Sequence, residues 1–459
     1  MKVIVFSAAF FSVLSILSAQ DHSEFIEGPF ASPQEVTETC LTCHEEAGDE
    51  VMSTRHWQWQ GEEFELKDGR KIALGKRNLI NNFCIAVTSN WPRCTSCHIG
   101  YGWKDMTFDF TDPLNIDCLV CHEQTGTYKK SPAGAGYPEE NVDLLKVAQS
   151  VALPKRANCG TCHFDGGGGT GVKHGDMDDS LYEPSAELDV HMGGNDFQCT
   201  ECHLTEAHKI SGAGHGSMAE GVNHISCMDC HDEETHSKSI LNQHIKTVAC
   251  ETCHIPEFAK AEPTKIWWDW SAAGYDEEKD KDEFGKDIYD KKKGEFVWAK
   301  NVRPKYLWYD GSADYYIPGD KIKPGEIVEL NKLNGNIIDP ASKITPFKVM
   351  RGKQPFDPVN NDLIIPKLYG DGGYWKTFDW NLAAENGMKA AGLDYSGKYD
   401  FIETKMYWPI NHMVVPKEVA LKCTNCHGKN GDKYLDWKRL GFRDDPIKKG
   451  RRSEGNIAK

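Results

Sequence analysis

One short cysteine pattern, repeated eight times, constrains this chain more than any other feature. Sixteen of its 17 cysteines belong to copies of Cys-x-x-Cys-His. The copies are Cys40/Cys43/His44, Cys94/Cys97/His98, Cys118/Cys121/His122, Cys159/Cys162/His163, Cys199/Cys202/His203, Cys227/Cys230/His231, Cys250/Cys253/His254 and Cys423/Cys426/His427. This pattern attaches a c-type haem, because the two thiols bind the porphyrin and the histidine ligates the iron. Zinc sites or disulfides would not require a histidine after every second cysteine. The sequence therefore predicts eight covalently bound haem c groups.

The N-terminus predicts export. Met1-Lys2 carries positive charge, and Val3–Leu17 is apolar but too short to span a bilayer. Leu17-Ser18-Ala19 has the small residues of a cleavage site. We interpret residues 1–19 as a Sec signal peptide and expect the bacterial periplasm, where c-type haems are attached. A retained membrane anchor is the alternative. No later apolar stretch approaches transmembrane length, so stable membrane insertion is not expected.

The charge balance bears on partners. The formal net charge is −16, and haem propionates would make it more negative. Nucleic-acid binding is therefore not expected. An acidic surface suits a small basic electron carrier, whereas an anionic substrate would need local basic residues. Basic residues available near the first two motifs are Arg55, Lys76, Arg77, Arg93 and Lys104.

The motif positions divide the chain. Seven motifs lie between Cys40 and His254, and Ile255–Thr404 contains neither cysteine nor histidine. We predict a seven-haem region over 20–260, a haem-free insert rich in aromatics over 261–410, and an eighth-haem segment with a tail over 411–459. The expected fold class is a multihaem cytochrome c fold. It would consist mainly of short α-helices and extensive loops around closely packed haems, with a small β content in the insert.

The insert differs in character from the seven-haem region. Aromatic clusters occur at Trp267–Trp270 and Tyr306–Tyr309, and short β-prone runs occur at Ile327-Val328 and Leu363–Ile365. We expect these aromatics to be packing residues rather than a cofactor box. Asp276–Lys293, rich in aspartate and lysine, is expected to be an exposed loop or short helix.

Ten histidines lie outside the motifs. His22 is close to the predicted cleavage site and is expected to be uninvolved. Low-spin electron-transfer haems need a second axial ligand each, for which there are nine candidates. These are His56, His174, His191, His208, His215, His224, His236, His244 and His412. Nine candidates for eight irons permit a pure electron wire. An enzyme needs at least one iron with an exchangeable or unusual distal side, and the count leaves both possibilities open.

The chain resembles the octahaem tetrathionate reductase family of periplasmic cytochromes over nearly its whole mature length. The motif count and the long gap before the last motif both fit. Specific strings also fit, above all the glycine-rich Cys159–Asp176 with Lys-His near its end. The others are Leu241–His244, Val248–Pro256 and Trp408–His412.

The resemblance implies one active haem, on the second motif, whose distal ligand is Lys173. The other seven haems would be bis-histidine, with distal ligands His56, His174, His191, His208, His236, His244 and His412. The resemblance also places Asn81 and the odd cysteine, Cys84, near the active haem, and Asp176 is our candidate for an acid of the pocket. A lysine ligates iron only as the neutral amine, so its pKa must be lowered by the metal and by burial.

Several functions remain open. The resemblance favours a reductase that acts on a small inorganic substrate, tetrathionate or nitrite and hydroxylamine. Cys84 could then exchange with an S–S bond as a thiolate. Its electron donor would be a periplasmic protein, either a small cytochrome or a membrane quinol dehydrogenase. The alternatives are a non-catalytic electron-transfer protein and an enzyme that oxidises hydroxylamine or hydrazine.

Overall fold

The computed structural model describes residues 21–66, 69–212, 225–428, 434–449 and 457–458. The predicted signal peptide, His215, His224 and Arg451-Arg452 lie outside these residues. The chain is 24% helix and 18% strand. Within the described residues, no helix is both long and apolar enough to cross a membrane.

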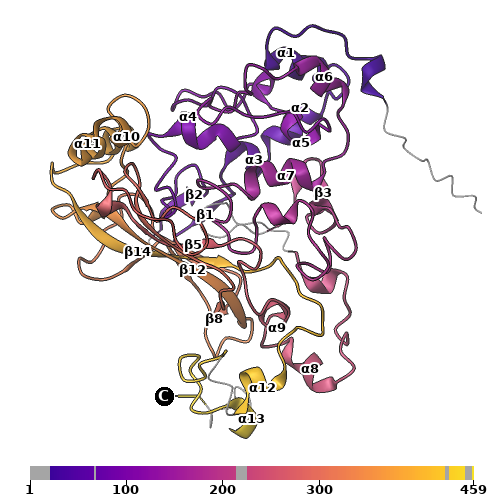
Figure 1. The fold of residues 1–459 in the computed structure, drawn as a ribbon, viewed down its shortest axis with the longest axis vertical. Helices are drawn as coiled ribbons and strands as arrows, with labels where there is room; N and C mark the ends of the chain where they lie inside the picture. The colour runs from indigo at the N-terminus through magenta and orange to yellow at the C-terminus, as the bar shows by residue number, and fades with distance from the viewer. Residues whose placement is uncertain (1–20, 67–68, 213–224, 429–433, 450–456, 459) are drawn as a thin grey trace, which may run out of the picture.

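Short helices joined by loops form the N-terminal region, drawn from indigo to magenta in Figure 1. They are α1 (Pro33–Leu41), α2 (Ala47–Met52), α3 (Arg55–Gln58), α4 (Trp91–Cys94), α5 (Leu119–His122), α6 (Leu144–Gln149), α7 (Arg156–His163), α8 (Ser239–His244) and α9 (Cys250–His254). Three of them, α5, α7 and α9, end at a motif histidine. Helix α1 begins where Ser32 accepts a hydrogen bond from the Glu35 backbone and Pro33 takes the first helical position. Two small hairpins pair β1 (Glu63–Glu65) with β2 (Lys71–Ala73) and β3 (Thr205–Glu206) with β4 (Lys209–Ile210).

A mixed eight-stranded sheet fills the stretch that lacks motifs. Its central strand is β12 (Lys343–Asp357), which pairs antiparallel with β14 (Asp400–Pro409) and parallel with β5 (Thr264–Asp269). The remaining strands are β6 (Tyr289–Asp290), β7 (Gly294–Ala299), β8 (Lys305–Tyr309), β10 (Val328–Glu329) and β13 (Asp362–Leu363), and β9 (Ala313–Tyr315) with β11 (Asn331–Leu333) forms a separate pair. Helices α10 (Tyr374–Thr377) and α11 (Trp380–Ala391) lie at one end of the sheet, and α12 (Cys423–Cys426) and α13 (Pro446–Lys449) lie at the bottom of Figure 1.

This sheet is larger than the small β content expected for the insert. The signal lies in β14, where Ile402, Thr404, Met406 and Trp408 are buried and the residues between them are more exposed. Such alternation is typical of a strand with one buried face. The predicted loop at Asp276–Lys293 is mostly exposed and leads into the hairpin of β6 and β7.

The largest apolar core joins the sheet to the N-terminal region. Trp268 and Trp270 are buried there with Met350, as expected of packing residues. Phe83 and its neighbours in the segment 80–86 pack into the same core, so the loop that carries Cys84 is held against the sheet. Burial of several aromatic side chains supplies most of the free energy that fixes this contact, at roughly 25 cal/mol per Å² of apolar surface.

Candidate functional site

Seven of the eight motif histidines lie opposite a second histidine. The ring centroids of each pair are 6.1–6.4 Å apart. Two metal–nitrogen bonds of about 2 Å and two ring radii of about 1.1 Å would place imidazoles that share a metal about 6.2 Å apart. The residues therefore fit seven bis-histidine irons. The pairs are His22–His44, His56–His163, His122–His208, His191–His231, His203–His412, His236–His254 and His244–His427.

Several of these rings are anchored through Nδ1, which leaves Nε2 free for a metal. Nδ1 donates to a backbone carbonyl or to a side-chain oxygen, and such bonds fix the tautomer and orientation of a ligand. The acceptors are Ala152 for His122 (2.9 Å), Ser211 for His203 (2.9 Å), Glu50 for His208 (2.7 Å), Asn242 for His236 (3.1 Å), Ile240 for His244 (2.6 Å), Asp176 for His412 (3.1 Å) and Asp445 for His427 (2.6 Å).

The cysteines fit haem attachment and not the alternatives. All 17 lie within the described residues, and none forms a disulfide. The described part of the chain also contains no group of three histidine, cysteine or acidic side chains arranged to hold a metal ion. The motif thiols are therefore available for thioether bonds to porphyrins.

The motif cysteines differ in how far the protein encloses them. Cys43 of the first motif is exposed. Its Sγ lies 3.8 Å from the Thr42 hydroxyl, just after α1. The other exposed motif cysteines are Cys202, Cys227, Cys230 and Cys423. Exposure is compatible with attachment, because a thioether needs only one side of the sulfur to face the porphyrin. Both cysteines of the second motif are partly buried.

Contacts between thiols show which motifs are neighbours. Thiols within hydrogen-bond reach join the first and third motifs, the second and fourth, the fourth and fifth, and the sixth and seventh: Cys40–Cys118, Cys97–Cys162, Cys159–Cys199 and Cys227–Cys250. Electrostatic contacts add the third and fourth, the fifth and sixth, and the seventh and eighth: Cys121–Cys159, Cys202–Cys230 and Cys253–Cys423. The motifs thus form a continuous path in the order 1, 3, 4, 5, 6, 7 and 8, and the second motif branches from the fourth.

The second motif differs from the others in its surroundings. Among the described residues, no histidine lies opposite His98. Its ring is fully buried in an aromatic box, with Trp103 at 4.9 Å and Trp57 at 5.1 Å between centroids. His98 Nε2 lies 2.7 Å from the Trp57 carbonyl, and Nδ1 has no partner. Burial lowers the pKa of His98 to about 3, so the imidazole is neutral. Its Nε2 donates to the Trp57 carbonyl, so in this arrangement that nitrogen is not free for a metal, in contrast to the rings anchored through Nδ1.

Lys173 lies in the glycine-rich loop that follows the fourth motif. Its Nζ is 5.1 Å from the centroid of Trp408 and 5.9 Å from that of Phe83. Burial lowers the pKa of Lys173 to about 7, the positive charge of Lys76 acts in the same direction, and nearby Cys97 of the second motif opposes them. A large part of the population is therefore the neutral amine at neutral pH, which is the form that binds iron.

The loop owes its path to glycines. Gly167 has φ +81°, and a side chain there would collide with Phe83. Gly171 has φ +68°, and its missing Cβ would lie 2.7 Å from the Pro263 carbonyl, just before β5. Only glycine combines this backbone conformation with so close an approach.

Cys84 and Asn81 lie beside this loop. The Cys84 thiol donates to the Gly167 carbonyl at 3.3 Å. Burial raises the pKa of Cys84 and the positive charge of Lys265 opposes this, so burial favours the thiol over the thiolate that exchange with an S–S bond would need. Asn81 Oδ1 accepts hydrogen bonds from the backbone of Phe83, Cys84 and Ile85 at 2.7–3.2 Å, and so holds the turn that presents Cys84.

Three predictions about individual residues require correction. Within the part of the chain that the structure describes, no histidine lies opposite His174, and its ring packs edge-on against Trp408 at 5.0 Å. His22, expected to be uninvolved, faces His44 instead. Asp176 accepts hydrogen bonds from the backbone of Asn411 and His412 and from His412 Nδ1, so it supports a bis-histidine pair rather than serving as an acid beside Lys173.

Lys265 is a basic residue of the site that the sequence did not reveal. Its Nζ lies 3.3 Å from the ring centroid of Phe296 and 3.9 Å from that of Trp268. Burial lowers the pKa of Lys265 to about 6, and Cys84 partly opposes this. No local spacing could have shown that strand β5 meets the Cys84 loop.

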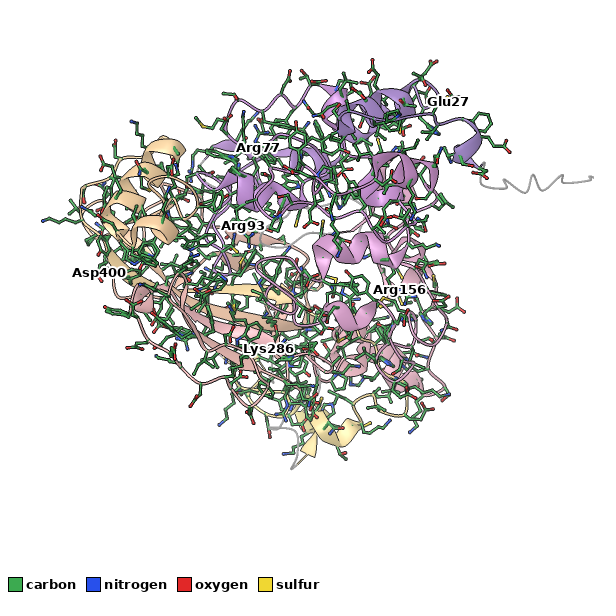
Figure 2. The ribbon with its side chains drawn as sticks, turned by 45° about the horizontal axis from the view of Figure 1, so that its top comes forward. Glu27, Arg77, Arg93, Arg156, Lys286 and Asp400 are labelled. Carbon is green, nitrogen blue, oxygen red and sulfur yellow. The ribbon has the colours of Figure 1, made fainter. Side chains whose placement is uncertain are left out.

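The basic residues expected near the first motifs are partly engaged with aromatic rings. Lys76 Nζ lies 3.9 Å above Trp59, and the Arg77 guanidinium lies 4.1 Å above Phe110. Arg77 and Arg93 are both labelled in the N-terminal region of Figure 2, and Arg93 donates to the Pro132 carbonyl at 3.1 Å.

Comparisons with known proteins agree with this geometry. A solved structure, the crystal structure of an octahaem cytochrome c from Shewanella oneidensis, is 52% identical in sequence and has a TM-score of 0.88. The match covers 96% of this chain and all of that chain. Two family models match: "Cytochrome c bacterial" over 265–430 and "Cytochrome c7 and related cytochrome c" over 185–255. An uncharacterised protein of Archaeoglobus fulgidus is 26% identical over 239 residues, which is 41% of this chain and 80% of the relative.

Proposed function

The chain belongs to the octahaem c-type cytochromes and carries eight covalently bound haem c groups, and we propose that it is a periplasmic reductase whose catalytic haem is that of the second motif. The proposed substrate is a small inorganic compound, tetrathionate or nitrite and hydroxylamine. The proposed donor is a periplasmic small cytochrome or a membrane quinol dehydrogenase.

One asymmetry carries this proposal. Seven motif histidines face a second histidine at the spacing of a shared iron, and His98 does not. Lys173, near the second motif, has a pKa suited to ligation as the neutral amine. The haem supplies the electrons and the reactive iron. Lys173 would ligate that iron as the neutral amine and, when not bound, would be able to hold a proton beside it.

The side chains around Lys173 suit an anionic or polar substrate. Lys76 and Lys265 bring two more basic groups to the region of Cys84, within a chain of net charge −16. An anion bound beside them would favour the protonated form of Lys265, whose pKa burial lowers to about 6, and so would gain a charged partner. The second motif lies at the end of a branch that starts at the fourth motif. Electrons can reach it from the fourth motif and need not travel through it to another motif, so its position fits a terminal acceptor.

The first experiment counts haem ligands. Electron paramagnetic resonance of the oxidised protein should show seven bis-histidine haems and one haem of different ligation. Lys173→Ala should change the signal of that one haem alone. Lys104→Ala, which alters an exposed lysine near the same motif, is the matched control and should leave all eight signals unchanged. If Lys173→Ala also leaves all eight unchanged, the lysine-ligated centre does not exist.

The second experiment identifies the substrate. Fully reduced protein is mixed with tetrathionate, nitrite or hydroxylamine, and haem reoxidation is followed by absorbance. A substrate of the proposed site reoxidises the wild type much faster than Lys173→Ala. A pure electron wire predicts the same rate in both proteins for all three compounds, and that result would eliminate the reductase.

A further inference from the structure

The loop that carries Lys173 is pinned to the sheet by two buried polar side chains, Lys348 on β12 and Thr264 on β5. Both side chains lie inside the protein, since neither residue is exposed to solvent. Lys348 Nζ donates to the carbonyls of Val172 and Lys173, each at 3.0 Å, and to Thr264 Oγ1 at 2.6 Å. All three acceptors thus lie within hydrogen-bond distance of the same nitrogen.

Thr264 completes the contact. Its hydroxyl lies 2.6 Å from the Gly171 carbonyl and 3.2 Å from that of His174. Together the two side chains therefore reach four consecutive carbonyls, those of residues 171–174. Backbone carbonyls of an irregular buried loop need such partners, because a buried polar group without one costs about 1–3 kcal/mol.

The same part of the sheet also supplies the surface beneath the amine. Lys348 pairs with Trp408 across β12 and β14, and the Trp408 ring lies 5.1 Å from Lys173 Nζ. One rigid pair of strands thus holds the backbone of the loop and contacts its side chain. A ligand on an immobilised backbone loses less conformational entropy when it binds a metal.

We infer that Lys348 and Thr264 are positioning residues that fix the backbone of Lys173, so that this lysine reaches and leaves the haem iron by side-chain rotation on a rigid loop. The inference rests on the proposed ligation of the second haem by Lys173. The inference adds that the sheet, 90 or more residues further along the chain, determines how tightly Lys173 binds the iron. Loosening the loop should lower the occupancy of the amine and favour competing ligands.

Two substitutions test the positioning role. Thr264→Val keeps the side-chain shape and removes the hydroxyl, and Lys348→Met keeps an apolar stem and removes the three donors. Each should weaken or abolish the signal of the lysine-ligated haem in electron paramagnetic resonance and leave the seven bis-histidine signals unchanged. Cyanide should bind to one haem in eight about 10–100-fold more tightly, which is the range by which the hydrogen-bond partners of a ligand usually alter binding at a metal site. Thr264→Ser should restore the wild-type behaviour, since it restores the hydroxyl.

Lys260 provides a matched control. Its Nζ also donates to two loop carbonyls, those of Leu188 at 2.6 Å and Met413 at 3.0 Å, but in another part of the structure. Lys260→Met should leave the lysine signal and the cyanide affinity as in the wild type.

The outcomes distinguish the positioning role of Lys348 and Thr264 from the proposed function. If Lys173→Ala alters the one haem and cyanide binding while Thr264→Val and Lys348→Met alter neither, the positioning role is wrong and the proposed function stands. If Lys173→Ala alters nothing, both are wrong. Should Lys348→Met fail to fold, the nearly isosteric pair Thr264→Val and Thr264→Ser still decides the question.

Discussion

His22→Ala compared with His174→Ala separates the ligand set of the structure from the set implied by family resemblance. In the structure, His22 faces His44 with 6.4 Å between ring centroids, and His174 faces none of the histidines that the structure describes. His22→Ala should therefore remove one axial ligand from one haem. His174→Ala should remove none.

The size of the effect follows from the haem count. Loss of one ligand from one of eight haems should give high-spin iron equal to about one-eighth of the total. His174→Ala should give no high-spin iron. Its cost is the edge-on contact with Trp408, worth about 0.5–1.5 kcal/mol of folding free energy, together with a small cavity.

The assay is spin quantitation by electron paramagnetic resonance, normalised to total haem from the pyridine haemochrome spectrum. Added imidazole should return the new high-spin haem of His22→Ala to low spin. High-spin iron in His174→Ala, with none in His22→Ala, would refute the assignment of axial ligands from the distances between ring centroids.

Three further predictions concern buried polar groups. Asp176→Asn should shift one of eight reduction potentials upward in a redox titration, because His412 loses a charged acceptor and becomes a weaker base; eight unchanged potentials would show that the carboxylate does not tune this pair. Alkylation of Cys84 by iodoacetamide, followed by mass spectrometry, should be slow at pH 7 and still rising at pH 9, because burial raises the pKa of the thiol and thiolate forms only at higher pH; a plateau near pH 7 would contradict this. Asp117→Asn should lower the free energy of unfolding by about 3–5 kcal/mol, since it leaves the buried Lys130 ammonium 2.9 Å from an uncharged partner. In urea unfolding, the addition of Lys130→Met should recover part of this loss. Strictly additive losses in the double variant would exclude an energetic coupling between the two side chains.

The haem sites could be predicted from sequence because each is local. Cysteines and a histidine within five residues form one helical turn, as at α7 and α9, and no distant contact is needed to recognise them. The sheet was underestimated for the opposite reason. Its central strand β12 is stabilised by β14, β5 and β8, and these pairings join residues tens of positions apart.

The second axial ligands are less predictable from sequence than the haem motifs and more predictable than the sheet. Most candidates were recognised because few histidines remain outside the motifs. No spacing rule distinguishes His22 from His174, since each lies far in sequence from any motif histidine that it could face. Proximity to the predicted cleavage site counted against His22, and the family resemblance counted for His174. Only the three-dimensional contacts with His44 and Trp408 decide between them.

The position of the insert bears on what the protein does. An electron wire needs closely spaced haems, and most of the bis-histidine pairs are built from residues of the N-terminal region. The insert, by contrast, sends Thr264, Lys348 and Trp408 to the loop of Lys173, and Lys265 to the neighbourhood of Cys84. These contacts converge on the loop of Lys173 and on Cys84, and Lys173 in turn lies near Cys97 of the second motif. A sheet that only enlarged the molecule would not require these four side chains beside Lys173 and Cys84. The convergence therefore favours a site built for ligand exchange at one haem over a protein that only conducts electrons.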